Sequence, residues 1–154
     1  MDFIIEVDGL EKNYKNRMTS ELRVPGGRAI NVARVLRRMG MPSVATGFLG
    51  GHTGDFIKEW LNMEGIQTSF IEIDDETRIN IKLYNQNIVI NGKGPNISFN
   101  EQTELLYFIS RIQEGDTVIL IGSLPPNVDK DILDRIISIC KANKAEFIVD
   151  AYPS

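Results

Sequence analysis

Two cations flank an amide along one stretch of alternating residues. Arg78, Asn80 and Lys82 stand at every second position of Thr77–Tyr84, and aliphatic residues fill most positions between them. Because side chains of a β-strand alternate between its faces, these three polar groups are expected on one side. A guanidinium and an ammonium around an amide form a plausible grip for a phosphate group. From the spacing alone, a solvated strand face remains the favoured explanation.

A pair of glycines precedes a helical stretch. Within Pro25–Asn31, Gly26 and Gly27 allow the backbone to approach a ligand closely, and the free N–H groups at a helix start attract anions and hydroxyls. Arg28 adds a charged fork, and Asn31 adds an amide suited to sugar hydroxyls or phosphate. The competing interpretation is a helix entry whose glycines make a tight turn.

Two loops after predicted strands contain further candidates. Gly122–Asn127 follows the most apolar strand, where open α/β sheets bind ligands, and Ser123 could donate there to a phosphate or sugar oxygen. A connection made rigid by its prolines is the alternative. The second loop, Gly47–Gly54, is rich in glycine but matches neither nucleotide-binding glycine motif, so closely packed turn glycines are favoured. We expect His52, the single histidine, to help start a helix rather than to act in catalysis.

Strand and helix patterns alternate along much of the chain, which predicts a parallel sheet with right-handed crossovers. The helix near residue 98 opens with a capping-box pattern, Ser98 to Glu101. Helical periodicity in the first helix puts Val32, Leu36 and Met39 on one face. The expected strands of this body are 43–48, 117–122 and 147–150, and residues 3–7 form a further expected strand. The expected helices begin after Gly27, near Phe56, at Ser98 and near Ile132.

Other segments alternate strictly between apolar and polar residues, which is typical of strands with one wet face. These segments are 20–24, 69–73, 77–84 and 88–90, with a turn at 85–87. We therefore predict a small separate sheet beside the α/β body, acting as a lid or as an oligomer contact.

Composition narrows the class of protein. The 154 residues carry 17 Lys and Arg against 21 Asp and Glu, for a net charge of −4, and this argues against a nucleic-acid partner. A single Cys excludes a disulfide framework and a cysteine-based zinc site. Since no apolar run approaches the ~20 residues of a membrane helix and no signal peptide is visible, we expect a cytoplasmic protein without a membrane partner. Apolar strands close to both ends predict a fragment, with a compact domain ending in an edge strand as the alternative.

Taken together, five segments resemble the PfkB (ribokinase-like) carbohydrate kinases, in the order of that family. The resemblance is greatest to its branch of 1-phosphofructokinases and tagatose-6-phosphate kinases, and Thr77–Lys82 favours the former. It implies a Rossmann-like α/β/α sandwich with a small β lid that often forms a dimer clasp. The segments are Gly26–Leu36, Gly50–Phe56, Thr77–Lys82, Gly94–Pro95 and Gly122–Pro126.

The resemblance implies that 1–154 is the N-terminal part of a ribokinase-like kinase domain, with lid strands within about 3–24 and 69–91. It also implies ATP and Mg²⁺ as cofactors of the full-length parent, a sugar phosphate as partner and a homodimer through the lid. Asp2 aligns with a substrate-contacting Asp, although the family's preceding strand and Asn-Pro are missing. The implied substrate-binding residues, together with those of the strand-face grip, are Asp2, Lys15, Arg17, Gly26, Gly27, Arg28, Asn31, Arg78, Asn80, Lys82 and Ser123.

The chain departs from the family pattern in three ways. Arg28 replaces the usual Lys, Ala29 replaces the usual Gly, and Asp150 opens Asp-Ala-Tyr-Pro where Asp-Thr-Ser-Gly is common. The family's catalytic Gly-Ala-Gly-Asp segment does not occur, so we expect neither a catalytic residue nor a metal ligand here. The expected parent converts fructose 1-phosphate to fructose 1,6-bisphosphate, whereas the fragment alone is expected to be inactive. The alternatives are a tagatose-6-phosphate kinase and a non-catalytic sugar-phosphate-binding or dimerisation fragment; an oxidoreductase domain is disfavoured because no G-x-G-x-x-G follows a strand.

Overall fold

The larger of two sheets forms the centre of the molecule. The computed structural model describes residues 2–6, 10–14, 21–83 and 88–151. The strands of this sheet run in the order β10-β9-β1-β4-β5, β6 also pairs with β4, and all of these pairings are parallel. The predicted parallel sheet is therefore confirmed. Its strands are β1 (Asp2–Glu6), β4 (Ser43–Gly50), β5 (Gln67–Thr68), β6 (Ile71–Ile73), β9 (Thr117–Gly122) and β10 (Glu146–Ala151).

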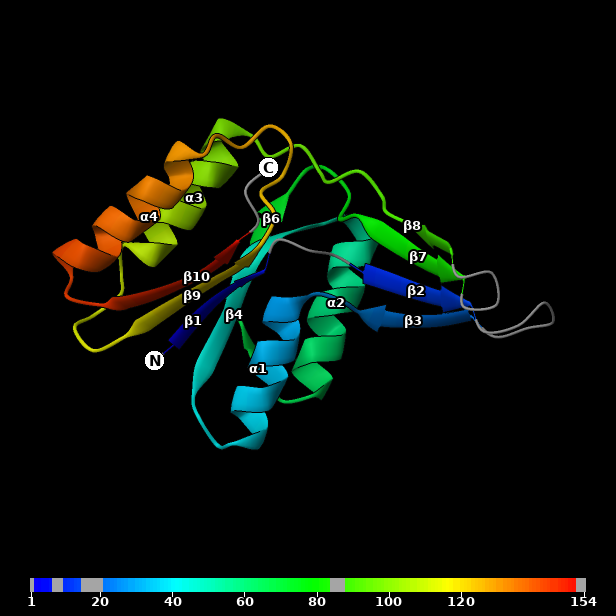
Figure 1. Ribbon diagram of the computed structural model, residues 1–154, viewed down its shortest axis with the longest axis horizontal. Helices are drawn as coiled ribbons and strands as arrows, with labels where there is room; N and C mark the ends of the chain where they lie inside the picture. The colour runs from blue at the N-terminus through cyan, green and yellow to red at the C-terminus, as the bar shows by residue number, and fades with distance from the viewer. Residues whose placement is uncertain (1, 7–9, 15–20, 84–87, 152–154) are drawn as a thin grey trace.

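Two pairs of helices cover the two faces of this sheet (Figure 1). They are α1 (Arg28–Arg38) and α2 (Gly51–Met63) on one face, and α3 (Phe99–Ile109) and α4 (Asp131–Ala142) on the other. Alternate residues of β4 enter two separate cores: Val44 and Phe48 pack with α3 and α4, whereas Ala45 and Leu49 pack with α1 and α2. The body is thus a three-layer α/β/α sandwich, as predicted.

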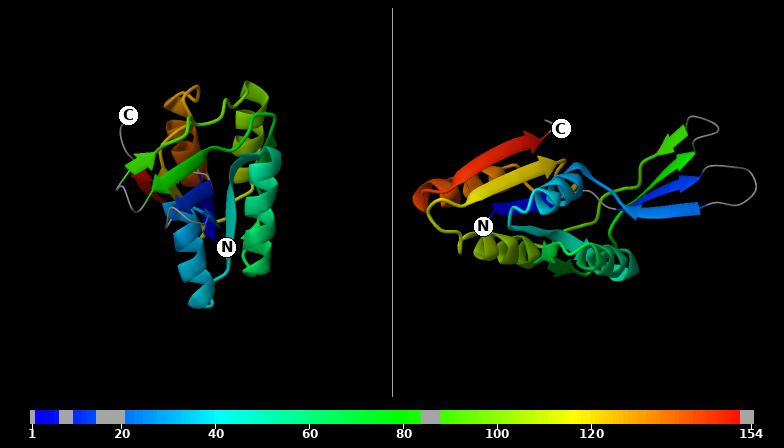
Figure 2. Two further views of the ribbon diagram at one scale, coloured as in Figure 1. Left: turned by 90° about the vertical axis from the view of Figure 1, so that its right-hand side faces the viewer. Right: turned by 90° about the horizontal axis from the view of Figure 1, so that it is seen from below.

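The smaller sheet projects beyond one end of the body (Figure 2). Its order is β3-β2-β7-β8, in which β2 and β7 are parallel and the outer pairs are antiparallel. Its strands are β2 (Leu10–Tyr14), β3 (Glu21–Pro25), β7 (Ile79–Leu83) and β8 (Ile88–Ile90).

Two strands within the ranges expected for the lid belong to the larger sheet. Residues 3–6 lie in β1, between β9 and β4, and 71–73 lie in β6 beside β4, so both belong to the body. Alternation identified these segments as strands but carries no information on their partners, which are distant in sequence. The turn predicted at 85–87 lies outside the described residues.

The structure tests two local sequence patterns, the capping box of α3 and the apolar face of α1. The capping box is confirmed, because Ser98 Oγ accepts from the Glu101 N–H at 3.2 Å and Glu101 Oε2 accepts from the Ser98 N–H at 2.7 Å. Of the three residues expected on one face of α1, Val32 and Leu36 pack against the core, whereas Met39 follows the end of the helix and is 66% exposed. Small residues instead bring α1 close to the sheet, and the buried residues of the helix are Ala29, Ile30 and Ala33.

Candidate functional site

The carboxyl ends of four parallel strands meet at one edge of the body. In the sheet register Asp150 of β10 lies beside Ile121 of β9, which also pairs with Glu6 of β1, and Glu6 in turn pairs with Gly47 of β4. Loops that leave this edge of a parallel sheet are the usual ligand-binding elements of α/β proteins.

The start of α1 is tied to this edge by an ion pair. Gly27 caps the helix with φ 109°, a conformation that favours glycine, and no side chain caps the first turn. Arg28 Nη1 donates to Asp150 Oδ2 at 2.7 Å, and Nη2 donates to the Asp150 carbonyl at 3.4 Å. Both side chains are well exposed, 40% and 62% respectively, so the pair lies at an open mouth. The helix start and the guanidinium together favour an anionic ligand.

Asn31 lies in the first turn of α1. Its side chain is exposed, and Oδ1 accepts from Arg34 Nη1 at 3.2 Å. Arg34 also donates to Glu64 Oε2 at 2.8 Å, so it is held in place from the far side. Gly26 is buried just before the helix, beside the end of β3. The residues of the turn from Gly26 to Asn31 thus lie together at the carboxyl edge.

The strand-face candidates lie on and before β7 of the small sheet. Arg78 is half-buried and directly precedes β7. Asn80 is also half-buried, but its Oδ1 accepts from the Gly92 N–H at 3.0 Å, so this oxygen already holds the connection that follows β8. Lys82 pairs in register with Asn13, and of Lys82 the backbone alone is described.

Ser123 lies in the loop that leaves β9. Gly122 has φ 114°, and Ser123 behind it is half-buried. Further along the loop, the Asn127 side chain binds both backbone groups of Ile97, at 2.9 and 2.6 Å. The loop is therefore fixed to the segment that returns from the small sheet.

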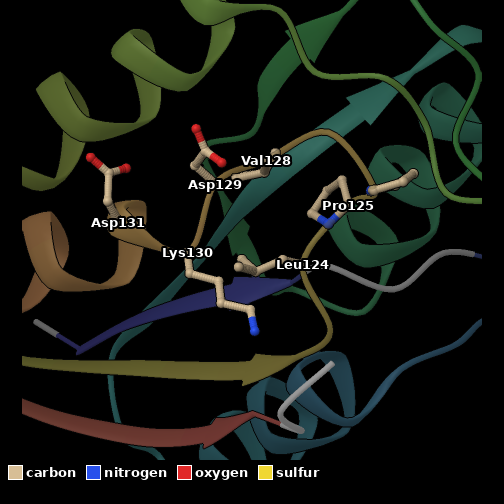
Figure 3. A pocket seen from close by; sticks show the side chains of 7 residues that line it. Leu124, Pro125, Val128, Asp129, Lys130 and Asp131 are labelled. Atoms are coloured by element: carbon tan, nitrogen blue, oxygen red, sulfur yellow. The ribbon is translucent and has the colours of Figure 1, made fainter.

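A hollow of about 570 Å³ opens beside this loop. Figure 3 shows Asp129 and Lys130 pointing in opposite directions from consecutive positions of its lining. Ser123 is not among the lining residues, and the sequence analysis did not single out Lys130. The signal that could have found Lys130 is its position between the most apolar strand and the next helix. The lining residues are Leu124, Pro125, Pro126, Val128, Asp129, Lys130 and Asp131.

Asp2 is not brought to the carboxyl edge. It begins β1 and pairs with Ser43 at the start of β4, which is the opposite end of the sheet. Four residue steps of a strand separate it from Glu6, or roughly 13 Å. The substrate-binding role expected for Asp2 stays a prediction. Lys15 and Arg17 lie outside the described residues.

The described residues hold neither a candidate metal cluster nor a thiol poised for reaction. They contain no group of three or more His, Cys, Asp or Glu arranged to hold a metal ion. Burial raises the pKa of the Cys140 thiol, which disfavours the reactive thiolate. In the ranges that the structure describes, no helix has the length and apolar character needed to cross a bilayer.

Comparisons with known proteins identify relatives of the chain. The chain is 38% identical over 151 residues to the 1-phosphofructokinase of Bacillus subtilis (strain 168), covering 97% of this chain and 50% of that protein. It is 36% identical to the D-tagatose-1-phosphate kinase of Bacillus licheniformis, with the same coverage of 97% and 50%. The chain thus spans about half the length of the curated relatives it matches.

A solved structure shares the fold over the same part. The crystal structure of a putative phosphofructokinase from Staphylococcus aureus superposes with a TM-score of 0.91 at 34% identity, covering 97% of this chain and 52% of that one. The family model described as pfkB family carbohydrate kinase matches residues 1–154. The chain therefore belongs to the pfkB family of carbohydrate kinases.

Proposed function

We propose that this chain supplies the sugar-phosphate side of a kinase that phosphorylates fructose 1-phosphate to fructose 1,6-bisphosphate. One observation carries the proposal: the start of α1, capped by Gly27, lies at the carboxyl edge with Arg28 held 2.7 Å from Asp150. The relative named 1-phosphofructokinase, at 38% identity, supports this choice of substrate.

In this proposal the residues of the chain bind and orient the sugar phosphate. The N–H groups at the start of α1 and the Arg28 guanidinium attract phosphate or hydroxyl oxygens, and Asn31 contributes a neutral hydrogen-bonding group. Arg78 and Ser123 contact the existing phosphate or its neighbouring hydroxyls. Such positioning is the main contribution a protein makes to in-line phosphoryl transfer.

ATP with Mg²⁺ would supply the transferred phosphoryl group and neutralise its charge. The described residues hold no cluster suited to the metal, and the sequence has no Gly-x-Gly-Asp segment. We therefore assign the cofactors and the general base to a further part of the parent protein.

An apolar edge strand supports the assignment to a larger parent. Phe147, Ile148 and Val149 of β10 are 38%, 54% and 44% exposed, although strands of a parallel sheet are normally covered on both faces. In our proposal the sheet of the parent continues beyond β10. The parent is further proposed to act in the cytoplasm.

The decisive experiment is a coupled ADP-release assay on the purified 154-residue chain with fructose 1-phosphate, ATP and Mg²⁺. We expect no turnover by the chain alone, with fructose 1-phosphate binding detected by calorimetry. Clear turnover would refute the assignment of the general base elsewhere. Two results together would favour the non-catalytic module. The first is fructose 1-phosphate binding that Arg78→Ala weakens, and the second is that ATP has no effect on a chimera in which this chain is joined to the C-terminal half of a relative.

A tagatose phosphate is the second candidate substrate. The relative named D-tagatose-1-phosphate kinase, at 36% identity, favours it. Titrations with fructose 1-phosphate, tagatose 1-phosphate and tagatose 6-phosphate would rank the three. Tightest binding of either tagatose ester would replace fructose 1-phosphate in the proposal.

The small sheet is proposed to form a homodimer. Its outer strand β8 exposes Ile88, Val89 and Ile90 by 43%, 58% and 51%, which is a liability for a solvated edge strand. Sedimentation velocity should show a dimer that Val89→Lys dissociates. A monomer at all concentrations would contradict this part of the proposal.

A further inference from the structure

The glycine-rich loop that matched no nucleotide motif supports the segment that leads into the small sheet. We call Gly50 and Gly51 the platform, and residues 73–77, which lie on it, the root of the small sheet. A Cβ atom on Gly50 would overlap the carbonyl oxygens of Asp75 and Ile73, and one on Gly51 would overlap the Glu76 carboxylate. A Cβ on Gly54 would lie 3.4 Å from Thr77 Oγ1. Gly50 and Gly51 therefore let residues 73–77, which lead into β7, lie directly on the start of α2.

Two neighbouring residues fasten this segment to the platform. Thr77 is 3% exposed, its N–H donates to the Gly50 carbonyl at 3.1 Å, and its Oγ1 accepts from the Gly50 N–H at 2.9 Å. Glu76 Oε1 accepts from the Thr53 N–H at 2.8 Å, in the first turn of α2. A carboxylate in this place accepts from a backbone N–H of the first helical turn, which has no partner within the helix, and it interacts favourably with the positive end of the helix dipole.

Two more carboxylates join the segment that precedes β7 to the segment that follows β8. Asp75 accepts from the Glu76 N–H at 2.9 Å and from the Asn96 N–H at 2.8 Å. Glu101, which is 8% exposed, accepts from Asp74 N–H at 3.1 Å as well as from Ser98 N–H. The chain between these two segments includes all of β7 and β8, so both ends of that hairpin are fastened to the body.

We infer that Thr77, Glu76 and Asp75 are positioning residues that fix the root of the small sheet and thereby hold Arg78 in place for the sugar phosphate. Arg78 follows Thr77 directly, so the backbone bonds of Thr77 set where the Arg78 side chain begins. The fastening itself rests on the contacts above. Its consequence for ligand binding rests on the proposed function.

The first test is hydrogen exchange of the 154-residue chain, which requires no ligand. Thr77→Val keeps the shape but removes the hydroxyl acceptor, and we expect amides of β7 to exchange about tenfold faster while those of β9 are unchanged. Thr77→Ser keeps the hydroxyl and should restore protection. Glu76→Gln should act in the same direction, with Glu72→Gln as its control, because the exposed Glu72 carboxylate bonds to nothing in the described part of the chain.

The second test measures the affinity for fructose 1-phosphate by calorimetry. Thr77→Val should raise the Kd severalfold, and Thr77→Ser should leave it near the wild-type value. Unchanged β7 exchange in both Thr77→Val and Glu76→Gln, or an equal acceleration in β9, would overturn the fastening. Faster β7 exchange with an unchanged Kd would overturn the positioning role. If the wild-type chain binds no sugar phosphate, the proposed function and the positioning role fail, whereas the exchange result still decides the fastening.

Discussion

The two regions that hold the predicted basic residues are built in different ways. Arg28 begins a helix whose Ala29, Ile30 and Ala33 are at most 1% exposed, so buried packing fixes its place in the body. Arg78 directly precedes a strand of the projecting sheet, and hydrogen bonds at the root of that sheet fix its place. The first position is hard to shift without unfolding the body, whereas the second depends on a few contacts.

The largest test of this difference places a methyl group under the root. Gly50→Ala should lower the free energy of unfolding by about 2–3 kcal/mol, since Gly50 has an ordinary φ of −146° but backbone oxygens occupy the space for a Cβ. Urea unfolding followed by circular dichroism measures this change.

Gly40→Ala is the matched control. Gly40 has φ +73° with nothing within 4 Å of an added Cβ, so backbone strain alone should cost about 1 kcal/mol. Equal losses in the two variants would mean that the platform has no special role.

A smaller effect is expected at the body side. Asp150→Asn removes the carboxylate that holds the Arg28 guanidinium in place at the carboxyl edge. Because the guanidinium is then no longer oriented toward the ligand, the Kd for fructose 1-phosphate should rise about three- to tenfold. The stability should change by less than about 0.5 kcal/mol, because exposed ion pairs contribute little.

Glu114→Gln serves as the control for this variant, since it removes an exposed ion pair with Lys144 at 3.9 Å. An equal rise in Kd from Glu114→Gln would show that the effect at Asp150 is not local to the site.

The smallest effect is expected from acid. Hydrogen bonds from Thr53 hold the pKa of Glu76 below its ordinary 4.5, and N–H groups of Asn96 and Glu76 hold the pKa of Asp75 below 3.8. His52 acts on Glu76 and Lys93 on Asp75 in the same direction. Because both values are depressed in the folded chain, their contribution is complete above about pH 5 and is lost as the pH falls through the folded values.

Urea unfolding at pH 6 and pH 4 checks this expectation. The wild-type chain should lose more stability between the two than Glu76→Gln, which has one titrating anchor fewer. A larger loss in Glu76→Gln would contradict the assigned role of the carboxylate. Glu72→Gln should behave as the wild type does.

The fold class could be predicted because its signals are local. Helical periodicity and the capping box at Ser98 identified the helices, and the fully apolar run 117–122 identified a strand covered on both faces. Partners could not be predicted in the same way. The parallel pairing of β2 with β7 joins Leu10 to Ile79, and no local pattern records a contact over such a distance.

In the candidate site too, local features could be predicted from the sequence and long-range contacts could not. The Gly26–Asn31 turn was found because glycines before a helix have a local reason, whereas the bond between Arg28 and Asp150 crosses 122 residues of sequence. The glycines at 50, 51 and 54 were correctly attributed to close packing. What packs on them was hidden, since the segment 73–77 reaches them through tertiary structure alone.

By itself, the sequence determined which segments form strands and helices, which residue types are available to bind a phosphate, and which family the motifs resemble. Backbone conformation and amphipathic periodicity depend on near neighbours, so these features are written locally. The tertiary structure decided that β1 and β6 belong to the body, that Asp2 lies at the far edge, and that Thr77 and Glu76 fasten the small sheet to α2. Those outcomes depend on which distant backbone groups meet and satisfy one another, and this is settled when the chain packs.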